Sequence, residues 1–227
     1  MPFPDLPDRL SEVRGRIAGA VARGGHGQTV VIVAVTKTHG ADAVLAAWNA
    51  GLPDVGENRV QEALAKQAEV TMPVRWHLIG HLQRNKVRHL EGFTLVQSMD
   101  SERLAGEIDA YGRARGTPVD ALVQVNVSGE STKGGFTPAS LATTAEQLRA
   151  MTGVRVRGVM TMAPIDAPEG VLRATFAGAR ESLTRLADAG HPATELSMGM
   201  SNDYEMAIEE GATIVRLGAV LFGARPG

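Results

Sequence analysis

The stretch Val30-Val31-Ile32-Val33-Ala34-Val35-Thr36-Lys37-Thr38 joins an unbroken apolar run to a lysine. Gly27 precedes this stretch and Gly40 follows it. A short continuous run rich in Val and Ile is typical of a strand that is covered on both faces, as the strands of parallel sheets are. The stretch therefore predicts a buried parallel strand that presents Lys37 at its carboxyl end.

Lys37 has two interpretations. An ammonium group that has lost part of its water shifts towards the neutral amine, which attacks aldehydes, so Lys37 is a candidate Schiff-base lysine. The alternative is that Lys37 only snorkels from the strand end to the surface. The chain has few lysines, so one at the end of a core strand stands out; they are Lys37, Lys66, Lys86 and Lys133.

Outward from this strand, β-like stretches alternate with amphipathic helices along the chain. The expected strands are 30–38, 53–58, 74–80, 93–98, 119–127, 154–162, 194–198 and 213–217. The expected helices are 5–23, 41–50, 59–70 and 83–90, followed by helices that begin at Ser101, at Thr137-Pro138, near Leu172 and at Ser201. This alternation predicts an α/β fold, a single (β/α)8 TIM barrel with an extra N-terminal helix, and an open doubly wound sheet is the alternative.

The amino-acid composition excludes several classes of function. Hydrophobic residues make up 44% of the chain and no linker interrupts it, so residues 1–227 are expected to form one domain with one large core. The 23 basic and 25 acidic residues nearly cancel, so no nucleic-acid partner is expected. Because the chain has no Cys, it forms no disulfide and no thiolate metal site. No apolar run resembles a signal or membrane segment, so we expect a cytoplasmic protein without a membrane partner.

Functional groups in such a barrel lie at the carboxyl ends of the strands. The sequence places Lys37, Asn58 and Arg216 there, together with two turns that contain glycine. The turn 197–202 leads into a helix that Ser201 is expected to cap, where an anion would be stabilised, and Gly218 supplies further backbone donors. This set suits an aldehyde that carries a phosphate. The alternative is that Ser201 only caps its helix and the glycines only allow tight turns.

Arg216 lies on an apolar strand, between Val215 and Leu217. A guanidinium group in such surroundings needs a partner. A ring nitrogen of a flat cofactor would serve, and so would a structural carboxylate such as Glu57.

Two weaker signals lie near the same mouth. Lys133-Gly134-Gly135, with Ser128-Gly129-Glu130, forms either a simple mobile loop after the fifth strand or a loop that folds over the mouth. His77 and His81 flank Gly80 without a carboxylate at ligand spacing, so no metal site is expected.

Six motifs cover nearly the whole chain. They are Ala-Val-Thr-Lys-Thr at 34–38, Gly-Glu-Asn-x-Val-Gln-Glu at 56–62, Trp-His-Leu-Ile-Gly-His-Leu-Gln-Arg-Asn-Lys at 76–86, Val-Asn-Val-Ser-Gly-Glu-x-x-Lys at 125–133, Ser-Met-Gly-Met-Ser-Asn-Asp-Tyr-Glu at 197–205 and Val-Arg-Leu-Gly-Ala-x-x-Phe-Gly-Ala-Arg at 215–225. Together they resemble the pyridoxal-phosphate homeostasis protein family. The resemblance implies a barrel like the N-terminal domain of alanine racemase, which binds pyridoxal 5′-phosphate as an aldimine on Lys37.

The resemblance also assigns the other site residues. It implies that Ser201 and the backbone of Met200 and Gly218 hold the phosphate, that Arg216 faces the pyridine nitrogen and that Asn58 lies beside the ring. It further implies a monomer with no catalytic residues and no established enzymatic activity. Such a protein would buffer the cofactor or deliver it to apo-enzymes that depend on it, with indirect effects on amino-acid metabolism. The alternatives are an amino-acid racemase that uses the same cofactor and a phosphosugar aldolase that uses Lys37 without it.

Two residues depart from the family pattern: Arg59 stands where many members have Tyr, and Ala219 where many have Thr. The second departure removes a hydroxyl from the expected phosphate site. We therefore predict that Ala219→Thr tightens binding of pyridoxal 5′-phosphate about fivefold, the worth of one hydrogen bond, as measured by titration. An unchanged Kd would show that a hydroxyl at position 219 does not reach the phosphate.

Overall fold

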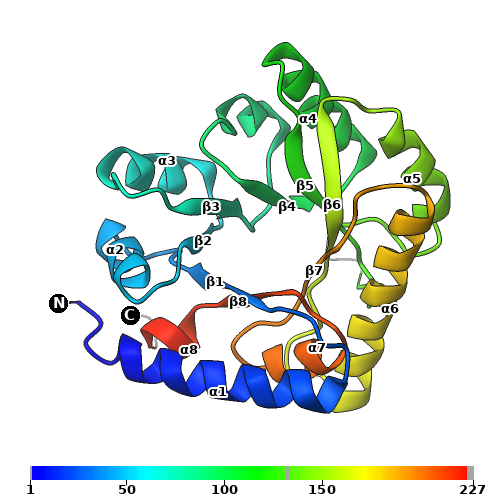
Figure 1. The fold of residues 1–227 in the computed structure, drawn as a ribbon. Coiled ribbons are helices and arrows are strands. Elements are labelled where there is room, and N and C mark those ends of the chain that lie inside the picture. The colour runs from blue at the N-terminus through cyan, green and yellow to red at the C-terminus, as the bar shows by residue number, and fades with distance from the viewer. Residues whose placement is uncertain (1, 131–132, 224–227) are drawn as a thin grey trace.

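The computed structural model describes residues 2–130 and 133–223, so the motif residues Ser131-Thr132 and Ala224-Arg225 lie outside the described part. Eight parallel strands close into a barrel in chain order (Figure 1). The strands are β1 (Val31–Val35), β2 (Asp54–Glu57), β3 (Arg75–Leu78), β4 (Leu95–Met99), β5 (Val119–Gln124), β6 (Val154–Met160), β7 (Glu195–Ser197) and β8 (Ile214–Leu217). The predicted (β/α)8 barrel is confirmed, and the open doubly wound sheet is wrong.

The helices surround the barrel (Figure 1). They are α1 (Leu6–Gly24), α2 (Ala41–Asn49), α3 (Val60–Glu69), the 3-10 helix η1 (Arg84–His89), α4 (Glu102–Ala114), α5 (Leu141–Arg149), α6 (Glu169–Asp188), α7 (Tyr204–Glu209) and α8 (Ala219–Phe222). The extra N-terminal helix is α1, which packs alongside α7 and α8 outside β8. Among the described residues, no helix combines the length and the apolar character needed to cross a membrane.

The strands are covered on both faces, as the apolar run at 30–35 predicts. Every residue of β2, β4 and β8 is buried. Inside the barrel, five apolar side chains from β1, β4, β5, β6 and β8 form a cluster: Val33, Leu95, Leu122, Met160 and Ile214. A larger apolar cluster fills the space between the strands and the helices. The interior is thus a packed core rather than a pore, and a ligand has room only at the ends.

Two helices begin later than predicted, and one further helix was not predicted. The helix expected at Thr137-Pro138 begins at Leu141, because Thr137 Oγ1 accepts the Ser140 N–H at 3.1 Å and forms a separate turn first. The helix expected to be capped by Ser201 begins at Tyr204 with Asp203 as its N-cap residue. The chain also forms the short helix α8 directly after β8, which the sequence pattern did not predict.

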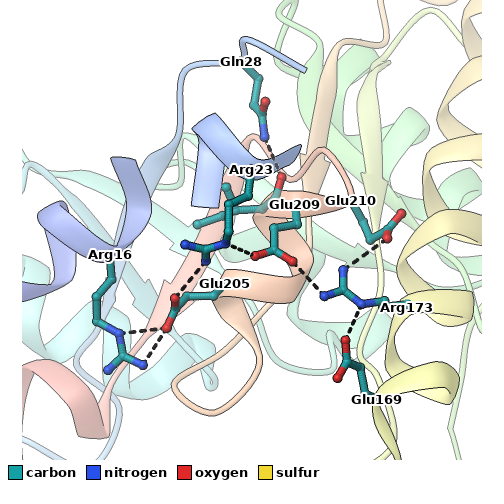
Figure 2. A network of polar contacts seen from close by, with 9 residues as sticks. Arg16, Arg23, Gln28, Glu169, Arg173, Glu205, Glu209 and Glu210 are labelled. Carbon is teal, nitrogen blue, oxygen red and sulfur yellow. Dashed lines mark hydrogen bonds and ion pairs between the residues drawn. The ribbon is translucent and has the colours of Figure 1, made fainter. Parts of the chain in front are cut away.

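The short helix α7 is held by ion pairs from two other helices (Figure 2). The Glu205 carboxylate forms ion pairs with two arginines of α1: Arg16 Nη2 lies 2.5 Å from Oε1, and Arg23 Nη2 lies 3.1 Å from Oε2. Glu209 accepts Arg23 at 2.5 Å and also Arg173 of α6 at 2.8 Å. A helix of two turns has little stability of its own, so this network helps to fix α7 and the turn that precedes it.

Glu209 makes the stability pH-dependent, because hydrogen bonds from Arg23, followed by those from Arg173, lower the pKa of its carboxyl group. A lowered folded-state pKa stabilises the protein above the unfolded pKa of about 4.3, and this contribution is lost as pH falls through the folded value. We predict that Glu209→Gln lowers Tm by about 2–4 °C at pH 7 and by less at pH 3, measured by scanning calorimetry. The control is Glu181→Gln on the exposed face of α6. An equal loss at both pH values would contradict the electrostatic origin.

Candidate functional site

A cavity of about 960 Å³ opens at the carboxyl ends of the strands. Its lining includes all six residues that the sequence analysis assigned to a site: Lys37, Asn58, Met200, Ser201, Arg216 and Gly218. The structure therefore brings them together from the ends of β1, β2, β7 and β8, although their roles remain predictions. Ala219, where a hydroxyl is expected to strengthen binding, also lines the cavity.

Lys37 lies in a tight turn directly after β1. Its side chain is half-buried and lines the cavity. The turn is closed by the His39 N–H, which donates to the Thr36 carbonyl at 3.1 Å. The next residue, Thr38, has a φ of 68°, a left-handed conformation that a β-branched residue rarely adopts. The lysine is thus presented by a strained turn rather than by the regular strand.

Arg216 is the buried cation of the site, with only 4% of its surface exposed. Its Nη1 donates to Ser197 Oγ at 2.6 Å and its Nη2 to the Thr161 carbonyl at 2.9 Å. Burial lowers the pKa of the guanidinium to about 10, and the charge of nearby Asp203 opposes this shift. The group therefore remains charged at neutral pH, with neutral hydrogen-bond partners.

The expectation that Glu57 is the structural partner of Arg216 is wrong. The Glu57 carboxylate accepts Lys66 Nζ at 2.7 Å and Thr36 Oγ1 at 2.5 Å. Side chains alternate along a strand, so a residue near the cavity in sequence can point to the helix layer instead. Among the described residues, no carboxylate makes an ion pair with Arg216, so the other proposed partner, a ring nitrogen, stays a prediction.

A chain of hydrogen bonds runs from Arg216 through the barrel interior. Ser197 Oγ donates to Gln97 Oε1 at 2.7 Å, Gln97 Nε2 lies 2.9 Å from His77 Nδ1, and His77 Nε2 lies 3.0 Å from Asp54 Oδ1. Because a guanidinium only donates and a carboxylate only accepts, the chain has one consistent direction. His77 then carries its proton on Nε2, and Ser197 turns its lone pair towards Arg216.

The turn between β7 and α7 offers donors for an anion. Gly199 has a φ of 91°, and a Cβ there would lie 2.7 Å from Ala207 Cβ, so only glycine allows this turn. The Met200 N–H donates to Asp203 Oδ1 at 2.6 Å, which commits a backbone donor that the sequence analysis had assigned to phosphate. In the described part of the chain, the Ser201 and Asn202 N–H groups donate to no other residue. Ser201 Oγ accepts the Val220 N–H at 3.4 Å, which leaves its hydrogen to donate.

The remaining rim of the cavity is polar. Asn58 follows β2, and a Cβ at Gly80 would lie 2.4 Å from the Asn58 carbonyl, so the ends of β2 and β3 approach closely. The sequence analysis missed Asp100, which lines the cavity and lies 3.0 Å from His81 Nδ1. It follows β4 directly, and that position at a strand end was the available signal. In the described ranges, no three His, Asp or Glu side chains cluster as metal ligands do.

The loop after β5 also reaches the mouth. Lys133 and Gly134 line the cavity, and Lys133 Nζ donates to the Ala163 carbonyl at 3.1 Å while pairing with Glu130. Of the two interpretations of this loop, the structure supports the one in which it folds towards the mouth.

The comparisons with known proteins agree with this geometry. The family model described as alanine racemase, N-terminal domain, matches residues 14–226. The pyridoxal phosphate homeostasis protein of Pseudomonas aeruginosa is 43% identical over 223 residues, which cover 97% of this chain and 96% of the relative. PipY of Synechococcus elongatus, solved with pyridoxal phosphate bound, has a TM-score of 0.85 at 37% identity and covers 96% of this chain and 100% of its own.

The closed barrel and the match to the alanine racemase N-terminal domain define the class of protein. The relatives of high sequence identity identify the family within that class. The chain belongs to the pyridoxal phosphate homeostasis protein family within the alanine racemase N-terminal domain group. The alanine racemase of Clostridium difficile has a TM-score of 0.72 at 17% identity and covers 97% of this chain but 58% of its own, so this likeness concerns the fold alone.

Arg216 gives a prediction about the protein without ligand. A buried cation without an ion-pair partner costs several kcal/mol of desolvation, more than its two hydrogen bonds return. We predict that Arg216→Met raises the Tm of the ligand-free protein by about 2–6 °C, measured by calorimetry. Arg155→Met, which removes a half-exposed arginine of β6, is the control and is expected to change Tm by less. A lower Tm for Arg216→Met would mean that the two hydrogen bonds outweigh the desolvation.

Proposed function

We propose that this protein binds pyridoxal 5′-phosphate in the cavity at the mouth of the barrel and acts in the homeostasis of that cofactor. The observation that carries the proposal is the convergence, in one cavity, of a lysine amine, a buried guanidinium and the donors of the Ser201 turn. When bound, the cofactor supplies an aldehyde, a pyridine nitrogen and a phosphate dianion. Each of these groups has a chemically suitable partner in the lining.

Different residues of the lining bind different groups of the cofactor. Lys37 supplies the amine for a Schiff base, which forms with loss of water and returns the free lysine on hydrolysis. Arg216 donates to the ring nitrogen, and Asn58 lies beside the ring. The Ser201 hydroxyl and the N–H groups of Ser201 and Asn202 donate to the phosphate, with the Gly218 and Met200 backbone close by. Gly218 lacks the Cβ that would narrow the cavity between β8 and β1.

A carrier fits this site better than an enzyme. A guanidinium only donates, so it leaves the ring nitrogen unprotonated and makes the ring a weaker electron sink, which disfavours racemisation. We propose that the protein buffers the cofactor or passes it to apo-enzymes, as a monomer in the cytoplasm where those enzymes are made.

The first test is the absorbance spectrum of the purified protein with added cofactor, followed by borohydride reduction and peptide mass mapping. We expect a yellow protein with one pyridoxyl group on Lys37, and at least a tenfold weaker uptake by Lys37→Ala. Lys86→Ala, which removes a lysine from η1, is the control and keeps the wild-type spectrum. A colourless protein that takes up no cofactor would overturn the proposal and favour the aldolase.

The same sample separates a carrier from a racemase. A protein that passes the cofactor on restores activity to an apo-enzyme faster than the same total amount of free cofactor does, and one that only buffers the cofactor restores it more slowly. In both cases L-alanine stays unchanged. Interconversion of alanine enantiomers at a rate of about 1 per second or more would identify an enzyme instead.

A further inference from the structure

The turn that carries Lys37 is held by a polar cluster on the side of β1 that faces away from the cavity. The cluster consists of Glu57 at the end of β2 and Glu62 and Lys66 on α3. Lys66 is only 5% exposed and Glu57 is fully buried. Neither of these residues nor Glu62 belongs to the described lining of the cavity. A buried lysine and two carboxylates next to a site, yet outside it, need a reason.

The Lys66 ammonium uses its three protons within this cluster. It donates to the Thr36 carbonyl at 2.9 Å, to Glu57 Oε1 at 2.7 Å and to Glu62 Oε1 at 3.0 Å. An ammonium group has three donors, so Lys66 is fully engaged. Its bond to the Thr36 carbonyl fixes the peptide group that immediately precedes Lys37.

The two carboxylates accept hydrogen bonds from the residues on either side of Lys37. Glu57 Oε1 accepts the Thr36 hydroxyl at 2.5 Å, and Glu62 Oε1 accepts the Thr38 N–H at 2.6 Å. The cluster therefore binds the residue before Lys37 twice and the residue after it once. Thr38 has a left-handed backbone, which costs roughly 1 kcal/mol or more unless the surroundings impose it.

From these contacts we infer that Lys66 and Glu62 are positioning residues for Lys37: they clamp the two peptide groups that flank it and aim its amine into the cavity. The Thr36 hydroxyl contacts the cluster, whereas the Lys37 side chain lines the cavity. The clamp contacts the peptide group on each side of Lys37. This inference rests on the proposed function, because it concerns the amine that would bond the cofactor.

The clamp has a specific consequence for binding. A ligand with an aldehyde needs the Lys37 amine at a bonding distance and angle, whereas a ligand of the same shape without the aldehyde does not. A displacement of about 1 Å at a reacting atom can cost up to about a hundredfold. Loss of the clamp is therefore expected to weaken pyridoxal 5′-phosphate selectively, by about tenfold, and to leave pyridoxine 5′-phosphate, which carries an alcohol instead, unaffected.

The experiment compares four variants of the full chain with the wild type. Glu62→Ala removes the acceptor of the Thr38 N–H and keeps the pair of Glu57 with Lys66, and Glu62→Gln restores an oxygen acceptor. Lys66→Met removes the centre of the clamp. Glu69→Ala is the matched control, because Glu69 lies on the same helix and is exposed. The readouts are calorimetric Kd values for the two ligands and the rate at which borohydride traps an adduct on Lys37.

We expect Glu62→Ala and Lys66→Met to bind pyridoxal 5′-phosphate about tenfold more weakly and to form the Lys37 adduct more slowly, with an unchanged Kd for pyridoxine 5′-phosphate. Glu62→Gln and Glu69→Ala are expected to match the wild type. Equal losses for both ligands in Glu62→Ala, or no loss at all, would overturn the inference. If Lys66→Met does not fold, the Glu62 pair decides alone.

Failure of the proposed function has a different signature. In that case the wild type itself takes up neither ligand. Labelling of Lys37 by formaldehyde and cyanoborohydride, with Lys86 as the internal reference, then decides the inference without the cofactor. A labelling rate that changes in Glu62→Ala and returns in Glu62→Gln supports the clamp, and equal rates in all variants refute it.

Discussion

Closure of the barrel between β1 and β8 is the constraint on which the site depends. Val31 pairs with Ile214, Val33 with Arg216 and Ala34 with Leu217, so the first and last strands lie in parallel register. Parallel pairing puts the carboxyl ends of both strands at the same edge. Lys37 and Gly218, which follow these strands, therefore meet at one mouth although they come from opposite ends of the chain. Without this closure, the amine and the donors of the last two loops would belong to different surfaces.

Three cations in and next to the site, Arg216, Lys66 and Lys37, lie in different surroundings. Arg216 keeps its charge even though burial lowers its pKa to about 10, because a guanidinium starts from so high a value. Lys66 forms ion pairs with two carboxylates, those of Glu57 and Glu62. Lys37, the amine that we propose bonds the aldehyde, is half-buried at the mouth. The fold thus assigns a different environment to each of the three cations.

Much of the fold and of the candidate site could be predicted from the sequence, for a physical reason. Buried parallel strands are apolar throughout, so the alternation of strands and helices identified all eight strands, and the strand ends identified the cavity lining. The partner of Glu57 could not be read, because a shift of one residue turns a side chain from the cavity to the helices. Nor could the start of α7 be read, since Ser201 and Asp203 are both good N-cap residues and the Asp203 side chain, which accepts the Met200 N–H, makes no capping hydrogen bond. Lys66 gave a signal that was missed: it shares a helical face with the buried Val60 and Ala63.

The empty barrel and the loaded barrel must both be stable if the protein is to release its ligand and take up another. Arg216 works against the empty form, because its charge lies among neutral partners. If a ring nitrogen accepts from this guanidinium, as we propose, it relieves part of that cost, and binding is then coupled to stability. The hydrogen-bond chain from Ser197 to Asp54 orients the guanidinium, and the groups that set the direction of this chain lie outside the described lining of the cavity. Under the proposed function, loading and release would then involve Lys37 at the mouth and would require no rearrangement of this interior chain.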